Sequence, residues 1–134
     1  MLPISDADVI RQTKPNITVF LITINALVFI YELMLKHMVG SSANYVRFFY
    51  QWGLIPVELS SGNEYTLLFT GYLDPLDITS YVPTWGTVFT AMFIHGGWLH
   101  FLGNMLYLWV FGRSIEDRLG YFWYIVLYLL GGLV

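Results

Sequence analysis

The chain has 134 residues, of which 57% are hydrophobic and only 11% are charged, and its mean hydropathy is +0.62. A soluble domain has about 25% charged residues, so a soluble chain of this composition would expose aggregating apolar patches, and lipid is the expected solvent. The net charge of −3 argues against a nucleic-acid partner, and the lack of cysteine excludes disulfides and thiolate zinc sites.

The first candidate transmembrane helix is residues 16–35, NITVFLITINALVFIYELML. Spanning the bilayer core takes about 20 apolar residues in a helix, and this segment is long enough. Its β-branched residues would favour a strand in water, but its length and apolarity favour a helix in lipid. Glu32, near the end of the segment, is expected to reach the interface. Residues 1–15 hold two aspartates and are predicted to be a cytoplasmic segment rather than a signal peptide.

The predicted loop after this span, residues 36–86, is too interrupted to cross the membrane. It contains residues 44–59, NYVRFFYQWGLIPVEL, which are aromatic and apolar. Gly53 and Pro56 break any long helix there, and Trp and Tyr favour the headgroup region. We therefore expect residues 44–59 to lie in or on the outer interface, followed by a turn-rich return.

Two further apolar segments follow. Residues 87–111, TVFTAMFIHGGWLHFLGNMLYLWVF, form the second predicted span, and residues 112–120 form a cytoplasmic turn. Residues 121–134, YFWYIVLYLLGGLV, begin a third span, but as a helix they rise only about 21 Å, less than the core thickness. The expected fold is therefore an all-α, polytopic membrane protein. Residues 16–134 would form a partial membrane domain of about three spans, the third incomplete, from the N-terminal part of a longer protein.

The positions of Lys and Arg predict the orientation of the chain in the membrane. Two spans place the residue stretches before the first span and after the second on the same side. That side has four basic residues and the intervening loop has two: Arg11, Lys14, Arg113 and Arg118 against Lys36 and Arg47. The N-terminus is therefore predicted to be cytoplasmic and the loop extracytoplasmic.

The second predicted span contains hydrogen-bonding groups that lipid cannot satisfy, and such groups mark a candidate functional site. His100 and Asn104 are four residues apart, so on a helix they share one face. Two convergent donors in a water-poor site suit a negatively charged oxygen that develops on a substrate. On one continuous helix, His100 lies near mid-depth. His95 is then about 140° around from it, so the two histidines are not expected to share a face, and His95 is expected to be structural.

Other interpretations of these residues remain open. Asn104 could simply hydrogen-bond a neighbouring helix, as polar residues do in membrane bundles. A helical zinc pair needs histidines four residues apart with a Glu between them, and because this pattern is absent, no metal site is predicted. Three glycines, which would let another backbone approach closely, are Gly96, Gly97 and Gly103. Ser114 lies about 21 Å along a helix from His100, so it is not a partner and is expected to N-cap a following turn.

The segment FTAMFIHGGWLHFLGNMLYLWVFGRSIEDRLGYFWYIVLYLLGGLV resembles the second and third transmembrane segments of rhomboid proteins, which are intramembrane serine proteases. The resemblance rests on a His-x-x-x-Asn spacing with a second His five residues upstream, followed by a G-x-x-x-E-D-R-L-G turn. It covers residues 85–134 closely. The first span, KPNITVFLITINALVFIYE, and the GLIP of the loop fit the same family more loosely.

The resemblance implies a bundle of six or more helices that hydrolyses transmembrane segments of other proteins with a serine–histidine dyad. The dyad residues would lie on a fourth and a sixth span, so this chain alone is expected to be inactive. His100 and Asn104 match the family's oxyanion-stabilising pair, and His95 matches a more structural histidine. Glu116, with Arg118 nearby, matches the acidic turn and is expected to be structural. No cofactor is predicted, and a bacterial inner membrane is the expected location.

The chain departs from the family pattern in the first loop. Many rhomboids have a Trp-Arg pair there, whereas this chain has Gln51-Trp52 with Arg47 earlier, which leaves the anchoring of the loop open. Two other functions are also open. The chain could belong to a non-catalytic rhomboid-like adaptor that binds transmembrane helices, or to an unrelated three-span structural protein.

Overall fold

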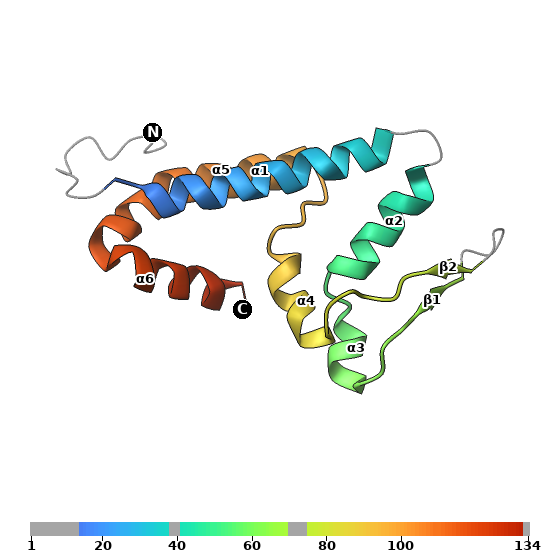
Figure 1. Cartoon of the computed structure of the whole chain (residues 1–134). Helices are drawn as coiled ribbons and strands as arrows, with labels where there is room; N and C mark the ends of the chain where they lie inside the picture. Colours follow the sequence, from blue (N-terminus) through green and yellow to red (C-terminus); the bar gives the residue numbers. More distant parts are fainter. Residues whose placement is uncertain (1–13, 38–40, 70–74, 133–134) are drawn as a thin grey trace. The chain divides into compact units, whose positions relative to one another are not determined.

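The structure is a computed structural model that describes residues 14–37, 41–69 and 75–132 (Figure 1). Most of these residues are helical, which confirms the all-α expectation. The elements in chain order are α1 (Asn16–His37), α2 (Ser41–Trp52), α3 (Pro56–Ser61), β1 (Leu67–Leu68), β2 (Leu76–Asp77), α4 (Thr84–Ala91), α5 (Trp98–Tyr107), the π-helical turn η1 (Leu108–Gly112) and α6 (Arg113–Gly131). The chain divides into two compact units, one of residues 1–27 and 95–134, the other of residues 28–94.

Helix α1 corresponds closely to the first predicted span. It runs from Asn16 to His37 and, at about 1.5 Å per residue, is long enough to cross a hydrocarbon core of about 30 Å. Within the described residues it is the one helix that is both long and apolar enough to span a membrane, with a hydropathy of 2.1. This helix indicates that the chain associates with a membrane.

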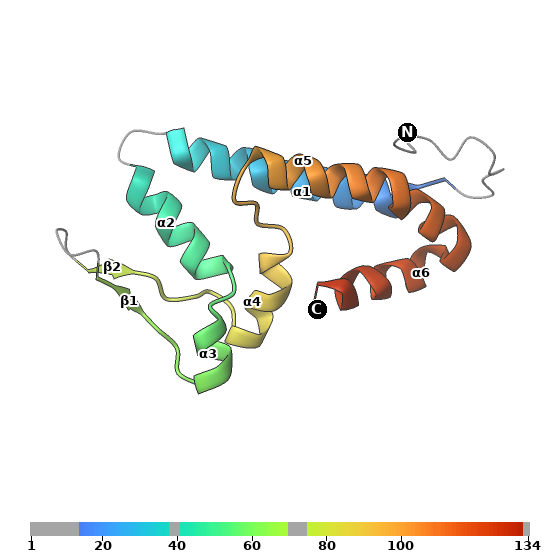
Figure 2. The same cartoon turned by 180° about the vertical axis from the view of Figure 1, so that it is seen from behind.

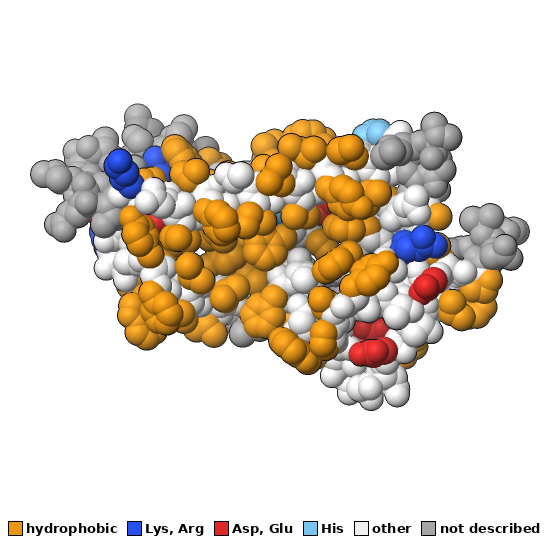
Figure 3. Space-filling view, in the orientation of Figure 1, with side chains coloured by type: hydrophobic (Ala, Val, Ile, Leu, Met, Phe, Trp, Pro, Cys, Tyr) orange, Lys and Arg blue, Asp and Glu red, His pale blue; other side chains and the backbone are white. Residues whose placement is uncertain are grey.

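The side chains of α1 are distributed in the opposite way to those of a helix in a soluble protein. Its buried residues recur every three or four positions and are mostly polar: Thr18, Leu21, Asn25, Phe29 and Glu32. Its large exposed residues are apolar or aromatic: Val19, Phe20, Leu27, Ile30, Tyr31 and Met34. Figure 3 shows hydrophobic side chains over most of the visible face of α1. The expectation that Glu32 reaches the interface is wrong, because Glu32 lies on the buried stripe and is 2% exposed.

The N-terminus of α1 is capped by a carboxylate from the other end of the chain. The first backbone N–H groups of a helix have no partner inside it. Here Ile17 and Thr18 donate theirs to the two carboxylate oxygens of Glu116, at 2.8 and 2.9 Å, and the Thr18 hydroxyl adds a third bond at 2.6 Å. Glu116 is fully buried, and both views place the start of α6 beside the first turns of α1 (Figures 1 and 2).

Two tyrosines of α6 extend this polar contact along the first part of α1. The Thr18 hydroxyl lies 3.3 Å from the Tyr124 hydroxyl. The side-chain amide nitrogen of Asn25 lies 3.5 Å from the Tyr128 hydroxyl. Asn25 also donates to the carbonyl of Leu21 at 2.7 Å, so its amide is bonded although buried. The residue that makes room for Tyr124 is Gly112. A Cβ on Gly112 would overlap the Tyr124 hydroxyl and lie 3.3 Å from the Thr18 hydroxyl.

The predicted cytoplasmic turn of residues 112–120 is largely helical. Helix α5 continues through η1 into α6, and the helical conformation is interrupted only at Gly120, where φ is 77° and ψ is 169°. Residues that carry a side chain rarely adopt a positive φ, so glycine is the residue expected at this break. The expectation that Ser114 N-caps a new turn is therefore wrong, because Ser114 lies inside a helix that has already begun. The helix resumes after Gly120 and runs to Gly131.

The second unit holds the predicted interfacial loop. As expected, α2 ends at Trp52 just before Gly53, and α3 begins at Pro56. Two hydroxyl groups donate to backbone carbonyls at the end of α2. The Ser80 hydroxyl donates to the Gln51 carbonyl at 2.7 Å, and the Thr90 hydroxyl donates to the Trp52 carbonyl at 2.5 Å. These contacts anchor the end of α2 to the return segment and to α4. Main-chain carbonyls of the Gln51-Trp52 pair thus accept the hydrogen bonds at this break.

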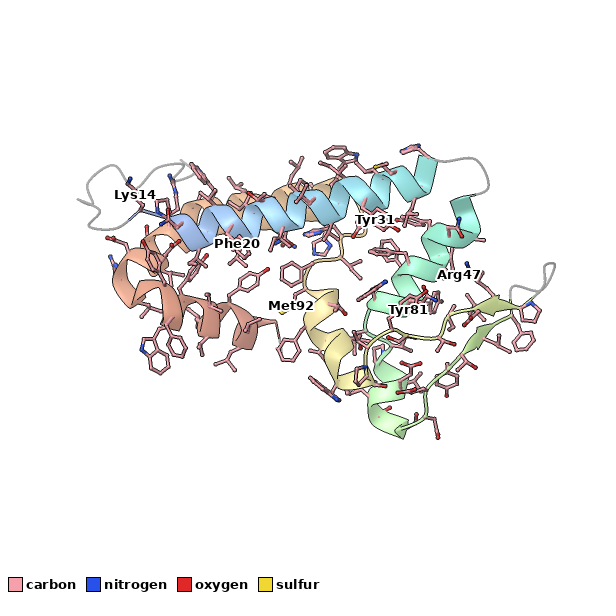
Figure 4. The ribbon with its side chains drawn as sticks, in the orientation of Figure 1. Lys14, Phe20, Tyr31, Arg47, Tyr81 and Met92 are labelled. Carbon is pink, nitrogen blue, oxygen red and sulfur yellow. The ribbon has the colours of Figure 1, made fainter. Side chains whose placement is uncertain are left out.

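A short antiparallel pair, β1 with β2, was not expected in this unit. Its second strand ends in a turn in which the amide and the hydroxyl of Thr79 donate to Asp77, at 2.9 and 2.7 Å. These hydrogen bonds lower the pKa of the exposed Asp77 carboxyl, with a smaller contribution from the nearby Arg47 charge. Arg47 itself donates to the Asp77 carbonyl at 3.1 Å, which joins α2 to β2 (Figure 4).

The second predicted span, residues 87–111, is not one helix. Helix α4 ends at Ala91, residues 92–97 are not helical, and α5 begins at Trp98. Gly96 and Gly97 stand just before α5, and Gly97 is fully extended. Two successive glycines disfavour a helix interior by about 1 kcal/mol each, which explains the break. Apolarity alone did not reveal it.

Replacing Glu116 with Gln should weaken the cap on α1. Gln keeps one acceptor oxygen but loses the charge and the second acceptor, so we expect the free energy of unfolding to fall by about 1.5–3 kcal/mol. Detergent-induced unfolding followed by circular dichroism measures this change. The control is Glu64→Gln, because Glu64 is exposed, and its shift should stay within about 0.5 kcal/mol. Equal shifts in the two variants would contradict the capping role.

Replacing Gly112 with Ala should force Tyr124 away from Thr18. We expect a loss of about 1–3 kcal/mol of unfolding free energy from overpacking, measured in the same way. Gly103→Ala is the matched control on α5, because no atom of the described residues lies within 4 Å of its Cβ position. That change should be neutral or stabilise the helix by up to about 1 kcal/mol. Adding Tyr124→Phe to Gly112→Ala should recover part of the loss, and no recovery would refute this explanation.

Candidate functional site

The two candidate oxyanion donors lie in the first half of α5. His100 is in the first turn of the helix, which begins at Trp98, and Asn104 follows one turn later on the same face. His100 is therefore close to one end of α5, and the continuous helix from residue 87 on which the mid-depth expectation rested is not present. The His100 side chain is exposed and that of Asn104 is half-buried.

His95 and His100 are neighbours in the structure. Their ring centroids are 5.3 Å apart with an interplanar angle of 54°, and His95 also meets the edge of the Phe101 ring at 5.3 Å. The expectation that the histidines do not share a face is therefore wrong. It assumed a continuous helix, whereas the non-helical residues before Trp98 bring His95 back toward α5. His95 is 1% exposed, in contrast to His100.

Helix α5 and the η1 turn present three different stripes. Phe101, Met105, Leu108 and Gly112 form a stripe of buried or half-buried residues. A second stripe, here called the leucine stripe, is exposed and apolar: Leu99, Leu102, Leu106 and Trp109. A third, here called the polar stripe, consists of His100, Asn104, Tyr107 and Phe111. At 3.6 residues per turn, the members of the polar stripe lie within about 60° of one another, well away from the leucine stripe.

The polar stripe carries three side chains that can form hydrogen bonds. In the part of the chain that the structure describes, the side chains of His100, Asn104 and Tyr107 make no hydrogen bond to another residue. Lipid cannot serve as their partner, whereas it suits the leucine stripe well. The arrangement therefore presents donors to a polar group that approaches this one face of the helix.

The remaining predicted site residues make no contribution to the polar stripe. Apart from the local backbone, no atom of the described residues lies within 4 Å of a Cβ placed on Gly96, Gly97 or Gly103, so no other described segment approaches them closely. Glu116 is bound to the N-terminus of α1 and Arg118 is exposed, so neither joins the donors. Lys14 lies at the same end of the unit as Glu116, beside the first turn of α1 (Figure 4).

Sequence reasoning missed Tyr107 as a member of this face. It follows Asn104 by three residues and His100 by seven, which is helical spacing, and that signal was present in the sequence. Its ring is 67% exposed and stacks on Phe111, with centroids 5.5 Å apart and an interplanar angle of 24°.

A comparison with family models gives an independent result. Residues 83–134 match the model described as Rhomboid domain, and this segment includes all of α4, α5 and α6. Comparisons with curated proteins and with solved structures gave no match. The matched segment carries the polar stripe, the Glu116 cap and the Gly120 break. This match supports membership of the rhomboid family for residues 83–134.

Proposed function

We propose that the chain supplies the oxyanion-binding helix of a rhomboid-type intramembrane serine endopeptidase. Its rhomboid segment points to a family of intramembrane proteases. The observation that carries the finer assignment is the pair His100 and Asn104, one turn apart on a helix whose other exposed stripe is apolar. In this proposal the two side chains donate hydrogen bonds to the negative oxygen that forms when a serine attacks a peptide carbonyl.

The physical support is the value of donors in a site with little water. A pre-positioned donor needs no reorganisation as charge develops, and losing one typically costs 10²–10³ in rate. The 134 residues contain no Gly-x-Ser-Gly motif, so the nucleophile and general base of this proposal are not among them. The chain alone is therefore expected to bind but not to cleave.

The proposal also includes a membrane orientation. Lys14, Arg113 and Arg118 flank the end at which α1 begins and α5 ends, and basic residues favour the cytoplasmic side. That places the start of α5, with His100, toward the extracytoplasmic side. Water can reach His100 there, because it lies in the first turn of the helix. The expected partners are transmembrane substrates and the lipid bilayer, in a bacterial inner membrane.

Alanine substitutions test the oxyanion assignment in a form of the protein that carries the serine and histidine dyad. His100→Ala and Asn104→Ala should each lower kcat by about 10²–10³ with little change in expression, because each removes one donor. Cleavage of a reconstituted transmembrane substrate measures the rates.

Two control variants match these substitutions in residue type. His37→Ala at the end of α1 and Asn44→Ala on α2 replace exposed residues and should leave the rate unchanged. Wild-type cleavage by His100→Ala and Asn104→Ala would sink the assignment. A dyad-bearing form that binds substrate without any cleavage would instead favour the adaptor function.

Single cysteines test the orientation, because the chain has no cysteine of its own. Asn63→Cys, in the exposed segment after α3, should react with a charged, membrane-impermeant thiol reagent added outside intact cells. Arg118→Cys, exposed in α6, should react only after the cells are opened. Both positions are exposed, so a difference between them reports the side of the membrane. The opposite pattern would reverse the proposed topology.

A further inference from the structure

Tyr107 is a polar residue in an apolar part of α5. It is 67% exposed, and the described part of the chain offers its hydroxyl no hydrogen-bond partner. A buried or lipid-facing tyrosine usually finds a partner for its hydroxyl group. Its neighbours on the leucine stripe, such as Leu106, show that apolar residues fill the positions that suit lipid. Tyr107 lies on the same face of α5 as His100 and Asn104, by helical spacing.

The position of Tyr107 along the helix places it deeper than the two donors. The helical stretch from Trp98 to Leu119 rises about 33 Å, and Tyr107 lies about 13 Å from its start. His100 lies only about 3 Å from that start. The three groups thus form a line of donors from one end of the helix toward its middle.

The spacing of this line matches that of an extended peptide. An oxyanion held between His100 and Asn104 would lie about 7 Å along the helix axis from the level of Tyr107. In an extended chain, carbonyl groups on the same side recur every second residue, at about 6.6 Å. In a helical peptide, a rise of 7 Å corresponds to about five residues, and its carbonyls are already bonded within the helix. An extended main chain therefore fits the three donors better than a helix does.

We propose that Tyr107 is a specificity-determining residue of this site. Its hydroxyl donates to the main-chain carbonyl two residues from the scissile bond, on the side that lies toward the membrane middle. This inference rests on the proposed function, since the position of the scissile bond is taken from the His100 and Asn104 pair. This contact requires an extended main chain, because only an unwound segment offers free carbonyls at this spacing.

Phe111 defines the inner end of the polar stripe. Its ring stacks on that of Tyr107, and no hydrogen-bonding side chain of the stripe lies beyond it before Arg113. Because the Tyr107 ring packs on the Phe111 ring, the Tyr107 hydroxyl can bind a partner without the ring moving. Tyr107→Phe keeps this stack and removes only the hydroxyl.

Disulfide mapping in vesicles tests the proposal with the chain as it is. Synthetic transmembrane peptides of Leu and Ala with a central Gly pair are prepared as a series, in which a single cysteine moves along the peptide. Each is oxidised with chains that carry His100→Cys, Tyr107→Cys or, as the control on the leucine stripe, Leu106→Cys. His100 and Tyr107 are separated by about 10.5 Å along the axis. The preferred peptide positions should therefore differ by about three residues for an extended peptide and by about seven for a helical one.

We expect the peptide positions preferred by His100→Cys and Tyr107→Cys to differ by about three residues. We also expect the yield of cross-linked product to be several-fold higher for Tyr107→Cys than for Leu106→Cys. In the His100→Cys chain, Tyr107→Phe should lower the yield several-fold, whereas Leu106→Ala should not. An offset of about seven residues, or equal yields at 106 and 107, overturns the role of Tyr107. Cross-linking at 100 but not at 107 rejects this inference and leaves the proposed function intact. No cross-linking at 100 rejects both, and circular dichroism checks that every variant is helical.

Discussion

The carboxylate of Glu116 at the start of α1 is the interaction on which the first unit depends. A membrane helix cannot leave its first N–H groups to lipid, because lipid offers no acceptors. Glu116 supplies two of these acceptors from a position 98 residues away from Thr18. Its negative charge also lies where the dipole of α1 is positive. The chain therefore has to bring α6 to the start of α1, and Gly112 is the residue that permits this approach, since any larger side chain would displace Tyr124.

The same constraint explains why the interior of this protein is polar. Thr18, Asn25 and Glu116 are almost completely buried, while leucines and aromatic residues cover the outside. In lipid, apolar contact between helices brings little gain over contact with acyl chains, so hydrogen bonds and close packing carry the association. Helix α5 shows the consequence for function. Its leucine stripe suits lipid, and its polar stripe does not, so the polar stripe is the face available for chemistry.

Some of this arrangement could be predicted from local sequence. The bounds of α1 followed from its uninterrupted apolar length, and the break at Gly53 and Pro56 followed from the backbone restrictions of Gly and Pro. The shared helix face of His100 and Asn104 followed from helical spacing. The adjacency of His95 and His100 could not be predicted, because it depends on a break that apolar composition conceals.

The burial of Glu32 and the partners of Glu116 could not be predicted from sequence patterns, because both depend on contacts between residues far apart in the chain. Hydropathy places Glu32 near a helix end, but its burial follows from its place on the stripe that begins at Thr18, which tertiary contacts define. The partners of Glu116 lie on a different helix, so no local pattern identifies them. A family resemblance gave Glu116 a structural role, but only the geometry shows that it caps α1.

The start of α5 at Trp98 changes how the proposed site would work. A helix from residue 87 would bury His100 in mid-membrane, where water for hydrolysis is scarce. In the proposed orientation, a first turn at Trp98 puts His100 toward the extracytoplasmic end of the helix, with Asn104 one turn further in and Tyr107 near the middle. Under the proposed function, water and the scissile carbonyl then meet near the surface. The substrate must extend inward past Asn104 to reach Tyr107, so the requirement for an unwound segment arises from the depth at which α5 begins.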